Sequence, residues 1–196
     1  MLDIQELIDR EMIREKIYRY CRAVDRLDSA ELNGIFWDDA RYIGGPFPDD
    51  NTPPARDFLK LGMKVTVEDV FAQSMHSISN IIIDIDGDVA FSESYAHCHH
   101  ISHPTEAGRI ALIGAENNAE FKYSGADVVE MILGLRYIDR FEKRAREWRI
   151  AKRSLVIDWS QVQKWRGITH GGLYENLRLR GTRGIEDPVY SDTMQR

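Results

Sequence analysis

The chain has 196 residues, of which 43% are hydrophobic and 30% charged, with a formal net charge of −6. These values predict one soluble globular domain large enough for a real core. No run of about 18 apolar residues occurs, and the acidic, amphipathic first residues differ from a secretory signal, so we expect no membrane partner. Two cysteines, Cys21 and Cys98, lie in apolar patterns without metal-binding spacing, which favours a cytoplasmic location.

The charge is distributed unevenly along the chain. Residues 1–135 are acidic, whereas residues 136–196 carry more Lys and Arg than Asp and Glu. The basic residues there are interleaved with acidic ones on predicted strands and turns, and no RNA-binding aromatic motif or DNA-reading helix pair occurs. We therefore expect a solvated strand face and no nucleic-acid partner.

The first third of the chain has helical periodicity. Asp3 is placed to cap a helix whose apolar residues continue at helical spacing to Leu27. Ser29 begins a second, short helix, and residues 41–43 form a candidate strand.

A segment rich in proline follows at residues 46–54. It predicts a loop able to cover a pocket, because proline and Asp/Asn disfavour regular structure. Pro54 then suits the first turn of a helix that runs to about Met63.

Two apolar, alternating runs, Ser74–Ile85 and Asp88–Ile101, predict a β-hairpin around Asp86-Gly87. With those two residues as the turn, His76 faces His97. The same register gives three further cross-strand pairs: Ile78 with Tyr95, Asn80 with Glu93, and Ile82 with Phe91.

This register places His76, His97 and His99 on one face of the sheet, together with Tyr95 and Asn80. Polar groups on a half-buried face cost free energy unless they are paired, so this wall predicts a functional pocket. Three histidines also allow a zinc or iron site, but the spacing matches no specific metal motif and we expect no metal. His100 and His103 are expected to face solvent or lie in a loop.

The rest of the chain predicts a turn region at 103–108, a polar stretch near 117–127, and two strands over 128–141 and 147–159. Helices followed by antiparallel strands indicate an α+β fold with helices packed on one face of a curved sheet. The predicted domain covers residues 1–159. Residues 160–196 form a C-terminal extension, expected to pack on a neighbouring subunit or to be partly mobile.

Two charged residues occupy unusual positions. Asp25 lies at the edge of the apolar stripe of the first helix, either as an ordinary helix-edge carboxylate or at the rim of a cavity where it could orient an imidazole. Arg153 alternates with Ala151, Leu155 and Ile157, so it either extends outward to solvent or is buried against an anion or polar ligand.

Several segments together resemble the SnoaL-like family of the NTF2-like superfamily. They are Ile17–Asp25 (IYRYCRAVD), Phe36–Ala40 (FWDDA), His76, and Trp148–Arg153 (WRIAKR). The family includes scytalone dehydratase, hexachlorocyclohexane dehydrochlorinase, bile acid 7α-dehydratase and polyketide cyclases. The resemblance covers residues 4–159 and implies a cone-shaped α+β barrel whose strongly curved sheet is closed by helices around an apolar pocket.

The resemblance also implies roles for individual residues. Asp25 and His76 match an Asp–His dyad in which the carboxylate orients the imidazole as general base. Arg153 matches a pocket arginine, and Tyr20 takes a position occupied by lysine in the dehydrochlorinase and by tyrosine in the bile acid dehydratase, which disfavours halide elimination. His97 would assist as an acid. The expected pocket is completed by Trp37, Ile78, Asn80, Tyr95 and His99.

The sequence thus predicts a cofactor-independent lyase or isomerase that removes a proton from a hydrophobic, cyclic small molecule such as a steroid or other polycycle. No phosphate-binding glycine motif suggests a nucleotide. The alternative is a non-catalytic ligand-binding or scaffolding module, such as a relative of the small subunit of ring-hydroxylating oxygenases. The family also implies a homodimer or homotrimer.

Overall fold

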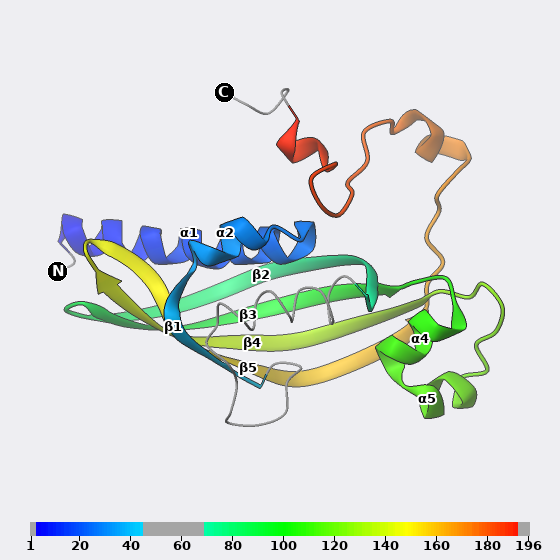
Figure 1. The fold of residues 1–196 in the computed structure, drawn as a ribbon, viewed down its shortest axis with the longest axis horizontal. Coiled ribbons are helices and arrows are strands. Elements are labelled where there is room, and N and C mark those ends of the chain that lie inside the picture. Colours follow the sequence, from blue (N-terminus) through cyan, green and yellow to red (C-terminus); the bar gives the residue numbers. More distant parts are fainter. Residues whose placement is uncertain (1–2, 45–68, 192–196) are drawn as a thin grey trace.

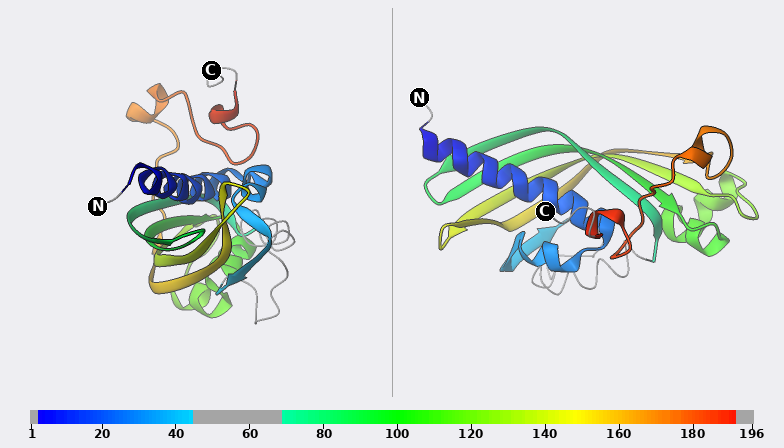
Figure 2. Two further views of the ribbon diagram at one scale, coloured as in Figure 1. Left: turned by 90° about the vertical axis from the view of Figure 1, so that its left-hand side faces the viewer. Right: turned by 90° about the horizontal axis from the view of Figure 1, so that it is seen from above.

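The computed structural model describes residues 3–44 and 69–191. Its centre is a strongly curved five-stranded sheet with helix α1 lying across one face (Figures 1 and 2). The strand order is β1-β5-β4-β3-β2, with β1 parallel to β5 and the other neighbours antiparallel. The strands are β1 (Phe36–Ile43), β2 (Phe71–Asp86), β3 (Val89–Ser102), β4 (Val129–Arg144) and β5 (Glu147–Lys164). The predicted α+β fold is confirmed, and the sheet is curved but open, with β1 and β2 at its edges.

Helix α1 (Ile4–Arg26) forms as the periodicity predicts. The Asp3 side chain accepts a hydrogen bond from the Glu6 backbone N–H at 2.7 Å, which satisfies one of the free amides of the first turn. Ile13 and Ile17 lie on the fully buried face toward the sheet. The helix ends at Leu27, whose left-handed φ of 58° directs the chain into the next helix. No helix in the described part of the chain is long and apolar enough to cross a membrane.

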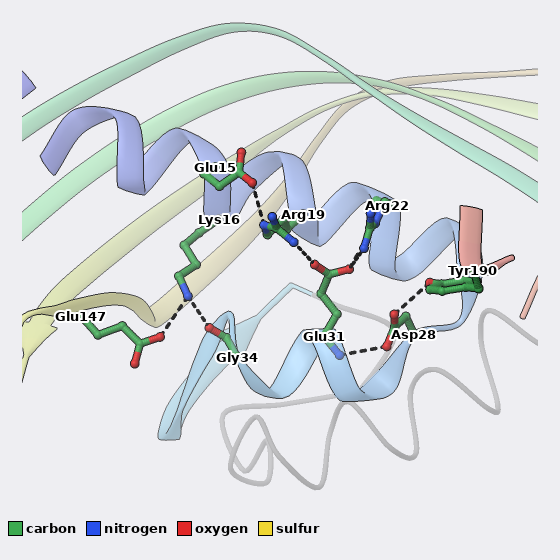
Figure 3. A network of polar contacts seen from close by, with 9 residues as sticks. All are labelled: Glu15, Lys16, Arg19, Arg22, Asp28, Glu31, Gly34, Glu147 and Tyr190. Atoms are coloured by element: carbon green, nitrogen blue, oxygen red, sulfur yellow. Dashed lines mark hydrogen bonds and ion pairs between the residues drawn. The ribbon is translucent and has the colours of Figure 1, made fainter. Parts of the chain in front are cut away.

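The short helix α2 (Ser29–Asn33) is held against α1 by polar contacts (Figure 3). The Glu31 carboxylate, largely buried, accepts hydrogen bonds from Arg19 at 2.8 Å and from Arg22 at 2.7 Å. Lys16 donates to the Gly34 carbonyl at 2.7 Å and also pairs with Glu147 on β5. These contacts hold the C-terminal half of α1 in place over the sheet.

The β2–β3 hairpin is confirmed, but its predicted register is wrong. The turn residues are Gly87 and Asp88, and Gly87 adopts a φ of 58°, which glycine accommodates without strain. A bulge between Ile78 and Ile81 shifts the pairing again, so that His76 lies opposite Cys98 instead of His97. A shift of one residue moves every following side chain to the other face of a strand.

Two short helices form where the sequence predicted a turn and a polar stretch. They are α4 (Glu106–Ile113), capped by the Thr105 hydroxyl, and α5 (Ala115–Glu120). The buried Arg109 joins them by donating to Asn118 at 3.0 Å and to two backbone carbonyls beyond. The predicted loop at 46–54 and the helix after it lie outside the described residues.

The hydrophobic core fills the space between α1 and the concave face of the sheet. Its largest fully buried side chains include Trp148, Phe141 and Ile150. Alternate residues of β3 point into this core, from Ala90 to Ser102, and all of the even-numbered ones are buried. The odd-numbered positions of β3 face the outer side of the sheet, which decides where the predicted site residues lie.

Candidate functional site

Asp25 and His76 form a buried pair between the last turn of α1 and the beginning of β2. Asp25 Oδ1 is 2.7 Å from His76 Nδ1, and Asp25 Oδ2 accepts the His76 backbone N–H at 2.9 Å. The Ser74 hydroxyl donates to Oδ1 at 2.9 Å. The side chains of His76 and Asp25 are only 7% and 11% exposed. The carboxylate is therefore held by three donors, and one imidazole nitrogen is fixed against it.

The two groups stabilise each other as an ion pair. Burial acts to raise the pKa of Asp25, but its hydrogen bonds with His76 and Ser74 lower the pKa below its usual value. Burial acts to lower the pKa of His76, whereas its hydrogen bonds with Asp25 and Cys98 raise it to about 10. At neutral pH the resting pair is an imidazolium beside a carboxylate.

The pair borders a pocket of about 360 Å³ between α1 and β2. Ile78, which the sequence places in the pocket, contributes to its wall. The other residues that line it are Tyr18, Cys21, Arg22, Asp25, Arg26 and His76. His76 is therefore part of the wall of this pocket.

His100 is a residue of the site that the sequence analysis missed. It is 3% exposed, and its ring lies 5.3 Å from the His76 ring and 4.3 Å from the Phe71 ring. Burial and the neighbouring His76 lower the pKa of His100 to about 3, so it is neutral. In the described part of the chain, its Nδ1 atom has no hydrogen-bond partner. The expectation that His100 faces solvent is wrong because the sequence register placed the odd positions of β3 toward the core, whereas the even positions, including His100, are the buried ones.

Tyr20 and Arg153 lie in a buried aromatic cluster within the cone. Arg153 donates two hydrogen bonds of 2.7 Å to Asp139, and both side chains are completely buried. The guanidinium packs on the rings of Tyr20 at 3.9 Å and Tyr137 at 4.3 Å, and the Tyr20 hydroxyl lies 3.3 Å from that of Tyr42. Of the two positions expected for Arg153, extension to solvent or burial against an anion, the structure shows the second. Its partner Asp139 was not identified from the sequence.

Three predicted site residues on β3 do not reach His76. Tyr95, His97 and His99 occupy odd positions and lie on the outer face of the sheet, because the bulge reverses the facing of β3 relative to His76. His97 packs against Trp159 with ring centres 5.1 Å apart, and His99 Nδ1 is 2.8 Å from Glu130. The three histidines that the sequence groups as possible metal ligands therefore do not converge.

Asn80 and Trp37 also lie apart from the dyad. Asn80 is exposed in the β2 bulge, where it accepts a hydrogen bond from Ser79. Trp37 donates to the Glu142 carbonyl at 3.0 Å, and the guanidinium groups of Arg144 and Arg149 lie 4.9 Å and 4.7 Å from its ring centre. Among the residues that the structure describes, no group of three or more His, Cys, Asp or Glu could hold a metal ion.

Comparison with models of known protein families assigns this chain to a family. The SnoaL-like domain matches residues 5–154, and the chain belongs to this family within the NTF2-like superfamily. A search of curated protein sequences gives no match.

Solved structures share the fold at low sequence identity. A hexachlorocyclohexane dehydrochlorinase, LinA Type2, has a TM-score of 0.64 and 16% identity over 87% of this chain and 98% of its own. LinA-type3 from Novosphingobium barchaimii LL02 has a TM-score of 0.63 and 16% identity, with 87% and 99% covered. A putative scytalone dehydratase from Novosphingobium aromaticivorans has a TM-score of 0.59 and 19% identity, with 85% and 97% covered. Neighbours in this fold thus include proteins described as dehydrochlorinase and dehydratase.

Proposed function

We propose that the protein is a cofactor-independent lyase or isomerase of the dehydratase type, acting on a hydrophobic cyclic small molecule through Asp25 and His76. The observation that carries this proposal is the 2.7 Å contact between a buried carboxylate and His76 Nδ1 beside a pocket. With Nδ1 protonated and directed to Asp25, Nε2 is the nitrogen that takes the substrate proton.

Because the pKa of His76 is raised, its neutral imidazole is a stronger base than an ordinary histidine. Neutral imidazole removes a proton from the carbon next to a carbonyl, and the electron pair moves into the carbonyl. In the elimination, that pair returns to form a C=C bond as the β-hydroxyl leaves, and the His76 imidazolium supplies the proton that makes it water. Return of the proton to another carbon gives isomerisation instead. The fraction of neutral His76 limits the rate, so activity should rise with pH.

Three further groups support binding of a polar substrate group. The neutral His100 has an unpartnered Nδ1 within the described residues, which can accept a hydrogen bond from a substrate hydroxyl. We retain Tyr20 and Arg153 as polar anchors deeper in the cone. Arg153 is completely buried and does not line the pocket beside the dyad, so this role requires the substrate to reach into the aromatic cluster.

Deuterium uptake tests this proposal. Cyclic ketones and β-hydroxy ketones are incubated with the protein in heavy water, and mass spectrometry follows exchange and loss of water. We expect exchange with the native protein and its loss in Asp25→Asn and His76→Ala. His170→Ala, which removes an exposed imidazole from the C-terminal extension, is the matched control and should keep full activity.

The outcomes separate catalysis from binding alone. Exchange that persists in both dyad variants would refute the assigned base. Tight binding of the same ketones without exchange would assign the chain to the non-catalytic ligand-binding module instead.

We also propose a cytoplasmic homodimer or homotrimer. The outer face of the sheet exposes several large apolar side chains that a second copy could cover, among them Met75, Tyr95 and Trp159, which are 59%, 40% and 44% exposed. Light scattering coupled to size-exclusion chromatography measures the mass, and a monomer at micromolar concentration would contradict this assembly.

A further inference from the structure

Tyr18 presents a second phenol to the proposed site, two residues before Tyr20 in α1. It lines the pocket of about 360 Å³ together with Asp25 and His76, and the residue is 47% exposed. Asp25 follows Tyr18 by seven residues, which places both on the same side of the helix, about 10 Å apart along its axis. In the described part of the chain, the Tyr18 hydroxyl has no hydrogen-bond partner. The phenol is therefore available to a ligand in the pocket.

The wall between the two ends of the pocket is apolar. Arg10, near the start of α1, donates to the Ile83 carbonyl near the end of β2, whereas Asp25, near the end of α1, contacts His76. Helix α1 and strand β2 therefore run in opposite directions. Ile78, which lines the same pocket, lies two residues beyond His76, toward the N-terminal end of the helix. A ligand that extends from the imidazole to the phenol therefore crosses this aliphatic side chain.

The two arginines that line the pocket already have carboxylate partners. Arg22 donates to Glu31 at 2.7 Å, and Arg26 pairs with Asp187 at 3.0 Å. Burial raises the pKa of the Cys21 thiol, which also lines the pocket, to about 12, so this thiol is uncharged. The dyad is an ion pair of its own. The pocket therefore favours an uncharged ligand, because a charged one would be buried without a partner of its own.

The C-terminal extension fixes the end of α1 beside this pocket. After β5 the chain passes the α4–α5 end of the sheet and returns beside α1 and α2 (Figures 1 and 2). We call residues 181–190 the C-terminal clasp. Gly184 N–H donates to the Arg26 carbonyl at 2.8 Å, and the Tyr190 hydroxyl donates to Asp28 at 2.8 Å (Figure 3). The clasp therefore holds the last turn of α1, and with it the spacing between the two ends of the pocket.

We propose that Tyr18 binds the end of the substrate that lies away from His76: its hydroxyl donates a hydrogen bond to a polar group there, and its ring packs on the flat face of the substrate. A tyrosine suits both contacts, because it has an apolar ring and a polar tip. The role of Tyr18 rests on the proposed function for the reaction at His76 but not for the binding step. Because the two ends of the pocket are about 10 Å apart, this role narrows the substrate to an uncharged ketone of about two fused rings with a second polar group opposite the carbonyl.

A matched pair of ketones tests this role: 6-hydroxy-1-tetralone, which has a hydroxyl on the ring opposite its carbonyl, and 1-tetralone, which lacks it. Equilibrium dialysis read by mass spectrometry gives both dissociation constants. We expect the hydroxylated ketone to bind about fivefold more tightly, the effect of one net hydrogen bond. Tyr18→Phe should remove this preference and leave the affinity for 1-tetralone unchanged. Tyr123→Phe removes a hydroxyl outside the pocket and should keep the preference.

Two further variants separate the ways in which the test can fail. Tyr18→Ala removes the ring as well and should weaken both ketones; it should fold, because the residue is half exposed on a helix and alanine is a good helix former. His76→Ala should keep the preference but lose deuterium exchange at the carbon next to the carbonyl. A native protein that shows the preference without exchange would refute the proposed function and still support the role of Tyr18. Equal affinities in the native protein, a preference that survives in Tyr18→Phe, or binding of neither ketone would overturn that role.

Discussion

Replacing Asp25 with asparagine isolates the electrostatic contribution of the dyad. The amide keeps the size of the carboxylate but removes its charge. Burial, which acts to lower the pKa of His76, is then opposed only by the contacts of the imidazole with Cys98. We therefore expect the pKa of His76 to fall well below its native value of about 10.

The size of this change follows from the pKa difference. The whole displacement of the His76 pKa from 6.5 to about 10 corresponds to roughly 4–5 kcal/mol at about 1.36 kcal/mol per unit, and this interaction is shared between Asp25 and Cys98. The free energy of unfolding should fall less, by about 1–3 kcal/mol, because the imidazole in the variant is neutral and no buried charge is left unpaired.

Imidazole NMR gives the direct assay, with the His76 ring signals followed from pH 5 to pH 11. Asp84→Asn, which makes the same change at an exposed position on β2, is the matched control and should leave the His76 titration unchanged. A His76 pKa near 6.5 in the native protein, or an equal pKa in Asp25→Asn, would refute the ion-pair reasoning.

Three other predictions follow from the same contacts. Between about pH 6.5 and pH 10 the folded state holds the His76 proton and the unfolded state does not. The pair should therefore stabilise the protein fully below pH 6.5 and progressively less up to pH 10. Urea titrations measure this, and a free energy of unfolding that does not change over this pH range would contradict the ion pair. Asp139→Asn leaves the buried Arg153 without its anion and should cost about 3–5 kcal/mol in urea unfolding, whereas the double variant with Arg153→Met should recover much of that loss. A Cβ at Gly134 would lie 2.2 Å from the Trp159 ring. Gly134→Ala should therefore displace the indole, shift its fluorescence and lower the free energy of unfolding by about 1–3 kcal/mol. An emission spectrum identical to that of the native protein would contradict this packing.

Local sequence signals predicted the elements well where a pattern repeats over many residues. The helical spacing and the Asp3 cap predicted α1, and alternation predicted β2, β3, β4 and β5. The short helices α4 and α5 were missed because segments of eight and six residues are too short to show clear helical periodicity. Arg109 on α4 joins the two helices by donating to Asn118 on α5 and to the Asp127 carbonyl beyond it.

The strand register could not be obtained from the same signals. A hairpin turn displaced by one residue and a single bulge after Ile78 were enough to place Cys98, rather than His97, opposite His76. Side-chain facing has a period of two, so an error of one residue exchanges the whole set of site residues. The structure accordingly brings in His100 and leaves Tyr95, His97 and His99 on the outer face.

The sequence by itself determined the fold class, the family and the elements that carry Asp25 and His76, because these depend on short-range periodicity and on residue motifs. Only the tertiary structure decided what surrounds those residues. The pairing of Arg153 with Asp139, the neutral His100 beside His76, and the return of the clasp to α1 all join residues distant in the sequence. Such contacts depend on register, burial and packing, which no local pattern specifies.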